Sequence, residues 1–426
     1  MTNIFEENIL YMSPVWSRIF AIQSERAEGS YIYGEDGRKY LDFTCGIGVT
    51  NTGHCHPKVV EAIRKQAGMF LHAQANIVIH KPMMQLIEEL RTIVPPSIDG
   101  FFFSNSGAEA VEGAMKLARN ATGKNSVIVF SGSFHGRTAG TMALTTSKTV
   151  YKMGPQLLPS GVYVAPYPYA YRLGMSETQA THYALEAVEE LLATQIAPSD
   201  VAAILIESVL GEGGYVPPPA GFLKGLREIC NKHGILLILD EIQSGFGRTG
   251  EWFAFNHYDV EPDIMTVAKG IASGLPLSGV FSSLDLMKKW PGGSHGGTYG
   301  GNSLACAAAV ATIQAMREEN MLENAQQRGT QLQTGLRKLQ EEYEQIGDVR
   351  GLGLMIGSEF EVEGKFKNAK PLVKEIIHAA EERGLLLLSC GTYDSTIRWI
   401  PPLNVTEGQV SDALNVFTDS LKVAIK

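Results

Sequence analysis

The chain has 426 residues, of which 44% are apolar and 19% charged, and its formal net charge is -9. This balance indicates a soluble globular protein, long enough for two large domains or for one large domain and one divided domain. The acidic charge, without any run of five or more basic residues, disfavours nucleic acid as a partner.

Secretion and membrane insertion are also disfavoured. The first eight residues lack the basic and long apolar segments of a secretory signal. The longest uncharged stretch, 291–316, is interrupted by Gly, Ser, Asn and His, so it cannot supply the roughly 20 apolar residues of a membrane span. The five cysteines are scattered without a C-x-x-C pair, which predicts a reduced, cytoplasmic protein with no disulfide framework and no zinc ribbon.

In chain order, the first predicted element is a β-hairpin over 30–43, with its turn at Gly34-Glu-Asp-Gly37. From about 58 to 325, short apolar runs alternate with longer amphipathic ones, a pattern typical of βαβ units around a mostly parallel sheet. The expected strands are 101–103, 127–130, 201–207, 235–240, 264–267 and 279–282, and the expected helices include 107–120, 220–233 closed by Gly234, and 303–317 capped by Asn302.

After about 325 the pattern changes to that of a small α+β unit. A Glu/Gln-rich helix precedes an expected strand over 354–360, a helix near 371–383 and a strand over 385–389. The capping box Thr406-x-x-Gln409 predicts the start of a last helix.

The segment Ser104-Asn-Ser-Gly-Ala-Glu-Ala110 follows an aromatic strand and opens a helix. Free backbone N–H groups and the helix dipole would point at any anion bound there, so the segment is a candidate phosphate cradle. An ordinary Ser or Asn cap with a Gly turn would give the same sequence.

The apolar strand that ends in Asp240 places a carboxylate where ligands bind in open α/β sheets. A carboxylate at this position could hold a heterocyclic nitrogen protonated, as a pyridinium electron sink requires. The other interpretation is that Asp240 only caps the following loop.

Lys269 follows another apolar strand and has no charged neighbour between 264 and 283. A lysine in such dry surroundings loses its proton more readily, as a Schiff-base nucleophile must, although most lysines are simply solvated.

Two other motifs are set aside. The Gly245-Phe-Gly-Arg-Thr-Gly250 segment does not sit on a strand-to-helix turn, so we expect a structured loop, not a dinucleotide site. The His54-Cys55-His56 segment has no matching ligands at zinc spacing, so we expect no metal.

Taken together, these motifs resemble the class III pyridoxal-phosphate aminotransferases of fold type I along nearly the whole chain. The stretches that carry the resemblance are Gly46-Ile-Gly-Val-Thr-Asn-Thr-Gly-His-Cys-His-Pro57, Asn105-Ser-Gly-Ala-Glu-Ala110, Phe134-His-Gly-Arg-Thr138, Gly211-Glu-Gly-Gly214, Asp240-Glu-Ile-Gln-Ser-Gly-Phe-Gly-Arg-Thr-Gly250, Ala268-Lys-Gly270 and Gly296-Gly-Thr-Tyr-Gly-Gly-Asn302. The resemblance implies a large α/β domain over 59–324, with a mostly parallel sheet flanked by helices. A small α+β domain would be made from the N-terminal segment 1–58 and the C-terminal segment 325–426.

The resemblance also implies pyridoxal 5'-phosphate as the cofactor. Lys269 would carry it, Asp240 would face the ring nitrogen and Gln243 the ring hydroxyl, and Phe134 would stack on the ring. The phosphate would be held by Ser106, Gly107 and Ala108, joined by Thr298 from a neighbouring subunit, which implies a homodimer or a dimer of dimers. His135 and Glu207 complete the expected cofactor-binding set.

Within the family, Ile47, Arg137, Glu212 and Arg398 make the chain resemble the enzymes that act on 4-aminobutyrate with 2-oxoglutarate as the acceptor. Arg137 would bind the distal carboxylate of an ω-amino acid, and Ile47 would pack against its methylenes. Glu212 would pair with Arg398 and release it when an α-carboxylate is bound. Acetylornithine, ornithine or diamine transamination and amino-acid racemisation or epimerisation stay open, as do two other classes, a dinucleotide-dependent dehydrogenase and a cofactor-free scaffold.

Overall fold

The computed structural model describes residues 4–155 and 157–425. The first three residues, part of the segment in which no secretory signal was found, lie outside the described residues. Among those described, no helix is long and apolar enough to cross a membrane.

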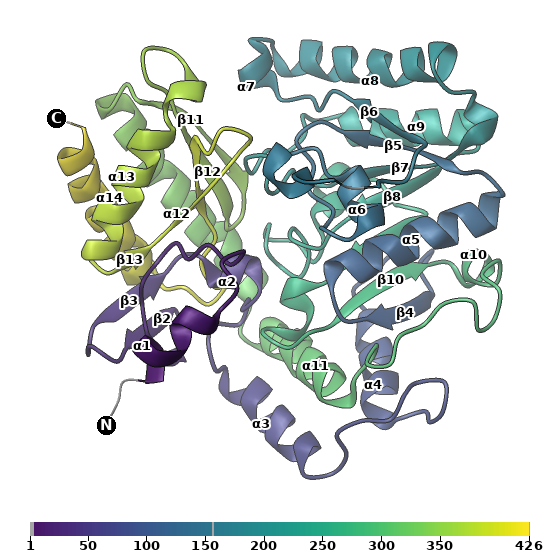
Figure 1. The fold of residues 1–426 in the computed structure, drawn as a ribbon, viewed down its shortest axis with the longest axis horizontal. Helices are drawn as coiled ribbons and strands as arrows, with labels where there is room; N and C mark the ends of the chain where they lie inside the picture. Colours follow the sequence, from purple (N-terminus) through teal and green to yellow (C-terminus); the bar gives the residue numbers. More distant parts are fainter. Residues whose placement is uncertain (1–3, 156, 426) are drawn as a thin grey trace.

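A seven-stranded sheet forms the centre of the larger part of the molecule (Figure 1). Its strand order is β4-β10-β9-β8-β7-β5-β6, and β10 alone among these strands runs antiparallel to its neighbours. The strands are β4 (Gly100–Ser104), β5 (Ser126–Phe130), β6 (Val162–Ala165), β7 (Val201–Glu207), β8 (Leu236–Asp240), β9 (Ile264–Val267) and β10 (Ser278–Ser282). The predicted mostly parallel sheet is thus confirmed, and β6 is a strand that the sequence pattern did not reveal.

Helices cover both faces of this sheet because its strands carry apolar residues on both faces. Val127 and Val129 pack against helix α5 on one face, whereas Ile128 and Phe130 belong to the larger core on the other. The helices of this part are α3 (Pro57–Ala67), α4 (Lys81–Leu90), α5 (Gly107–Thr122), α6 (Ala139–Leu144), α7 (Ala170–Leu173), α8 (Glu177–Thr194), α9 (Phe222–His233), α10 (Leu284–Met287) and α11 (Ser303–Glu318). The predicted caps at Gly234, in the left-handed region, and at Asn302 are both present.

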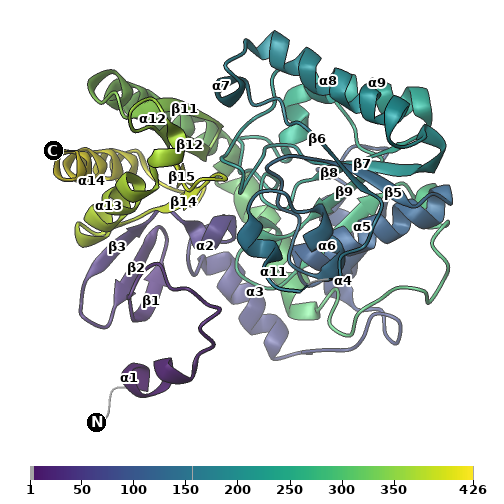
Figure 2. The same cartoon turned by 45° about the horizontal axis from the view of Figure 1, so that its top comes forward.

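Two four-stranded sheets form the smaller part, in which strands from the N-terminal segment lie beside elements from the C-terminal segment (Figure 2). One sheet contains β1 (Ser24–Glu28), β2 (Tyr31–Gly34), β3 (Lys39–Asp42) and β13 (Leu385–Leu386). The other contains β11 (Ile346–Leu352), β12 (Met355–Phe360), β14 (Leu388–Cys390) and β15 (Thr396–Trp399). The remaining helices are α1 (Ile4–Asn8), α2 (Cys45–Gly48), α12 (Met321–Glu342), α13 (Lys370–Glu382) and α14 (Glu407–Ala424).

The hairpin and the Thr406–Gln409 capping box are confirmed, but the single strand expected over 385–389 is wrong. Leu385 and Leu386 pair with β3, whereas Leu388 to Cys390 pair with β15, so the segment divides between the two small sheets. Both predicted domain boundaries fall inside helices, α3 and α12. Division of the chain at those residues stays a prediction.

The Gly245–Gly250 segment forms a buried, structured loop, as expected. The Arg248 side chain of this loop is buried, and its guanidinium donates hydrogen bonds to the carbonyls of Leu354 and Pro401 and to Asn51 Oδ1. The loop backbone packs against Gly353 in the β11–β12 turn, and Gly353 in turn packs against Gly329 of α12. Side chains would not fit between these three backbones.

We therefore expect Gly329→Ala to destabilise the protein. The added Cβ would collide with the Gly353 carbonyl, and overpacking of this kind costs about 1–3 kcal/mol. The control is Gly408→Ala on the exposed first turn of α14, where the nearest atom would be 4.0 Å away and alanine should be neutral or stabilising. Thermal unfolding midpoints at one scan rate test this, and a Gly329→Ala midpoint equal to wild type would contradict it.

Candidate active site

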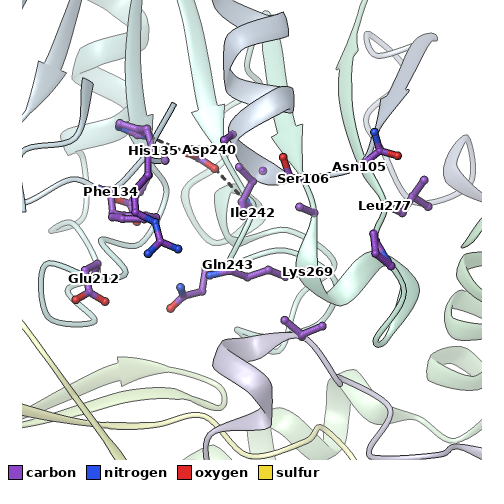
Figure 3. Close-up of a pocket in the computed structure, with 18 of the residues that line it drawn as sticks. Asn105, Ser106, Phe134, His135, Glu212, Asp240, Ile242, Gln243, Lys269 and Leu277 are labelled. Carbon is purple, nitrogen blue, oxygen red and sulfur yellow. Dashed lines mark hydrogen bonds and ion pairs between the residues drawn. The ribbon is translucent and has the colours of Figure 1, made fainter. Parts of the chain in front are cut away.

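A cavity of about 560 Å³ opens at the carboxyl ends of the parallel strands (Figure 3). It lies at the edge where the sheet of an open α/β fold binds its ligands. Most of the residues predicted from the sequence line it: Ser106, Gly107, Ala108, Phe134, His135, Arg137, Glu207, Glu212, Asp240, Gln243 and Lys269.

Three neighbouring strands place the central groups of this cavity. Glu207 at the end of β7 pairs with Asp240 at the end of β8, and Asp240 pairs with Thr266 of β9. Lys269 follows two residues after β9 ends. Residues far apart in sequence therefore meet because parallel strands in register end at one edge.

The Asp240 carboxylate is held by three donors. His135 Nδ1 lies 2.8 Å from Asp240 Oδ2, and the Ile242 N–H donates to Oδ1 at 3.1 Å (Figure 3). The Thr266 hydroxyl also donates to Oδ1, at 3.1 Å. A carboxylate supported in this way is fixed in orientation and stays available to a cationic partner in the cavity.

Lys269 begins a short 3-10 turn, η5 (Lys269–Ala272), with φ at 47°, in the left-handed region that few side-chain-bearing residues adopt. Its amine makes no hydrogen bond or ion pair with any residue the structure describes. Burial, reinforced by the positive charge of Arg398, lowers the pKa of Lys269 to about 8. Neighbouring carboxylates oppose this shift without reversing it.

The N-terminus of α5 has features of both interpretations of the Ser104–Ala110 segment, an ordinary helix cap and a candidate phosphate cradle. Ser106 and Glu109 form a capping box, in which the Glu109 carboxylate accepts from the N–H groups of Asn105 and Ser106. The N–H groups of Gly107 and Ala108 have no hydrogen-bond partner among residues 4–155 and 157–425. Two free donors at the start of a 16-residue helix can therefore face an anion in the cavity.

Glu207 connects two loops of the site through hydrogen bonds to their backbone N–H groups. Its two carboxylate oxygens accept the Phe134 N–H and the Gly211 N–H, each at 2.8 Å. Burial raises the pKa of Glu207 to about 7, although His135 and these two N–H groups favour the charged form. Glu207 thus fixes the Phe134 loop relative to the loop that carries Glu212.

The two arginines of the predicted substrate site are in different electrostatic states. Arg398 is buried, and its Nη1 donates to Glu212 Oε2 at 3.1 Å. Arg137 lines the cavity and makes no ion pair or hydrogen bond within the described part of the chain. The charge of Arg398 is therefore neutralised by the Glu212 carboxylate, whereas the guanidinium of Arg137 is available to bind the carboxylate of a ligand.

Three predicted residues do not line the cavity. Arg398 is buried next to Glu212, Thr298 is exposed on the 291–302 loop, and Ile47 lies in α2. Ile47 is 44% exposed and has a φ of 67°, which is strained for a β-branched residue. The roles assigned to these three residues stay predictions.

Sequence reasoning missed two polar side chains beside the site. Lys148 Nζ and the Tyr151 hydroxyl donate to Glu212 Oε1 at 2.9 and 3.0 Å. They come from the segment after α6, where an ordinary Lys and Tyr carry no motif. Their contacts with Glu212 and with other residues distant in the sequence distinguish them from surface residues.

Comparisons with known proteins agree with this geometry. Residues 12–421 match the family model described as "Aminotransferase class-III". A 5-aminovalerate aminotransferase of Pseudomonas aeruginosa is 41% identical over 94% of both chains. A 4-aminobutyrate aminotransferase of Escherichia coli is 41% identical over 94% of this chain and 93% of its own. The crystal structure of an (S)-enantioselective omega-transaminase from Thermomicrobium roseum superposes with a TM-score of 0.92 at 28% identity, covering 99% of this chain and 98% of the other.

The fold and site define a pyridoxal-phosphate enzyme of fold type I. The chain belongs to the class III aminotransferases, and pyridoxal 5'-phosphate is its cofactor.

The residues of this structure fit that group. The unpartnered N–H groups of Gly107 and Ala108 suit its phosphate, and the oriented Asp240 carboxylate suits its ring nitrogen. Gln243 lines the same cavity with a buried Oε1 that lacks a hydrogen-bond partner among the described residues. The amine of Lys269 is free to form the covalent attachment.

We expect the lowered pKa of Lys269 to be measurable in enzyme freed of cofactor. Because the pKa is about 8, the amine becomes neutral and nucleophilic above pH 8, whereas ordinary lysines do so near 10.4. Competitive labelling with an amine-reactive reagent across pH 6–11, read peptide by peptide by mass spectrometry, tests this. The exposed Lys224 serves as the internal reference, and a Lys269 midpoint as high as that of Lys224 would contradict the expectation.

Proposed function

We propose that this aminotransferase moves the amino group of an ω-amino acid, 4-aminobutyrate first among them, to 2-oxoglutarate. The products would be succinate semialdehyde and glutamate. The observation that carries the proposal is the contrast between Arg137, which has no side-chain partner among the described residues, and Arg398, which is paired with Glu212.

The protein's own groups divide the chemical work. Pyridoxal 5'-phosphate, when bound, supplies the electron sink that stabilises the pair of electrons left when the substrate carbon loses its proton. Lys269 holds the cofactor and then carries that proton as a general base and acid. Asp240, oriented by His135, would stabilise the protonated, positively charged form of the ring nitrogen. Phe134 would cover the ring face, and Gln243 would lie near the ring hydroxyl.

The arrangement suits substrates with two kinds of carboxylate. An ω-amino acid has one carboxylate, distant from its amine, and the planar guanidinium of Arg137 can bind it through two hydrogen bonds. Glutamate has a second carboxylate on the reacting carbon, which Arg398 can bind once Glu212 releases it. One cavity could thus serve both halves of the reaction.

The names of the relatives support the donor class. One relative is named for 4-aminobutyrate and another for 5-aminovalerate, and these donors differ by one methylene. Both carry a terminal amine and a distal carboxylate, as Arg137 requires. Ile47 would pack against the intervening methylenes.

The proposal includes a cytoplasmic homodimer or a dimer of dimers. Thr298 lies on an exposed loop and does not line the cavity of its own chain, which suits a residue that completes a neighbour's phosphate site. The five cysteines are free, as suits a reduced compartment.

Arg137→Ala should weaken 4-aminobutyrate as a donor by about tenfold to a hundredfold in kcat/KM, because a charge-assisted contact of about 1.5–3 kcal/mol is lost. A diamine donor has no carboxylate to lose, so its kcat/KM should change little. Arg137→Lys should recover part of the activity by keeping the charge.

Steady-state kinetics with both donors and with 2-oxoglutarate test this. A wild-type enzyme that prefers the diamine, or an Arg137→Ala variant that loses both donors alike, would overturn the assignment of the donor. A series from 3-aminopropanoate to 6-aminohexanoate would locate the best chain length.

Glu212→Ser should slow the ω-amino half-reaction more than the α-amino one, by about tenfold. Without Glu212, Arg398 stays an uncompensated buried charge when the donor has no α-carboxylate. Single-turnover reactions with 4-aminobutyrate and with glutamate measure both halves, and equal losses would show that Glu212 does not act as a gate.

A further inference from the structure

The two oxygens of Glu212 have separate partners. Oε2 accepts only from Arg398, at 3.1 Å, within the described residues. Oε1 accepts from Lys148 at 2.9 Å and from the Tyr151 hydroxyl at 3.0 Å. Glu212 can therefore lose Arg398 without losing its contacts on the other oxygen.

The Lys148 side of this arrangement is anchored independently of Arg398. Lys148 also pairs with Asp394, and Lys370 donates to the outer oxygen of Asp394 at 2.8 Å. The Tyr151 ring packs edge-on against Phe134, with ring centroids 5.0 Å apart. Lys148 and Tyr151 thus belong to a supported framework and do not depend on Glu212 for their positions.

The contact between Lys148 and Glu212 matters for the stability of the Glu212 charge because both side chains are largely buried. The side chains of Lys148, Glu212 and Arg398 are 14%, 12% and 8% exposed. Burial alone would raise the pKa of Glu212, yet the two cations hold it below its ordinary value. A buried anion that lost both cations would be strongly destabilised, so an anion released from one needs the other.

We propose that Lys148 is a specificity-determining positioning residue, which holds Glu212 when Arg398 turns to an α-carboxylate and so permits the second half of the reaction. This proposal rests on the proposed function, because it assumes that Glu212 gates Arg398. Tyr151 assists by donating to the same oxygen. Lys148 acts through Glu212 and need not touch substrate.

The test is Lys148→Met in the holoenzyme, with single-turnover rates for glutamate and for 4-aminobutyrate followed by the absorbance of the bound cofactor. Without Lys148, Glu212 has Arg398 as its only cation and should stay on it. The rate constant divided by the dissociation constant should fall about tenfold for glutamate and less than about twofold for 4-aminobutyrate. Lys148→Arg should restore the ratio, and Lys148→Gln provides a second neutral variant if Lys148→Met folds poorly.

Two controls separate positioning from general effects. Lys370→Met removes the same charge from the outer end of the network, where the side chain is 64% exposed, and should leave the ratio unchanged. In a Glu212→Ser background, Lys148→Met should no longer change the ratio, because the group through which it acts is gone.

Each outcome has a distinct meaning. If Glu212→Ser shifts the ratio but Lys148→Met lowers both rates alike, or leaves both unchanged, the proposal for Lys148 is overturned and the gate survives. A greater loss with 4-aminobutyrate would mean that Lys148 binds the donor carboxylate, which also overturns it. If Glu212→Ser shifts nothing, the gate in the proposed function fails, and the role of Lys148 fails with it.

Discussion

The in-register pairing of three parallel strands is the constraint on which the site depends. Strands β7, β8 and β9 end at one edge of the sheet, so Glu207, Asp240 and the turn that carries Lys269 converge there. Each strand is buried on both faces, which prevents it from sliding without exposing apolar residues or breaking its ladder. The positions of the reactive groups are therefore set by core packing.

Three carboxylates around the cavity differ because their partners differ. Glu207 accepts two backbone N–H groups, and burial raises its pKa to about 7. Glu212 has two cations, which lower its pKa despite burial. Asp240 is oriented by a histidine, a hydroxyl and an N–H. Near-identical side chains thus connect two loops, neutralise two buried cations and present an oriented carboxylate, according to what surrounds them.

Two segments that contain or adjoin residues lining the cavity have left-handed backbone conformations. Residues 45 to 48 all have positive φ, and Lys269 does too. The 45–48 turn is stabilised by Asp42, which accepts from the N–H and hydroxyl of Thr44 and from His54 Nε2. Strained residues persist only where surrounding contacts hold them, and such contacts are found here next to the reactive groups.

The sequence by itself determined the features that depend on neighbours within a few residues. Six of the seven strands of the large sheet, the Asn302 and Thr406 caps and the left-handed Gly234 follow from apolar patterning and capping chemistry. Motif resemblance added the candidate site residues. The resemblance also predicted that Glu212 pairs with Arg398. Only the tertiary structure decided that 385–389 divides between two sheets, and that Lys148, 64 residues from Glu212, binds the carboxylate oxygen that Arg398 leaves free. Such pairings depend on how distant segments pack, and no local pattern records which buried charges will meet.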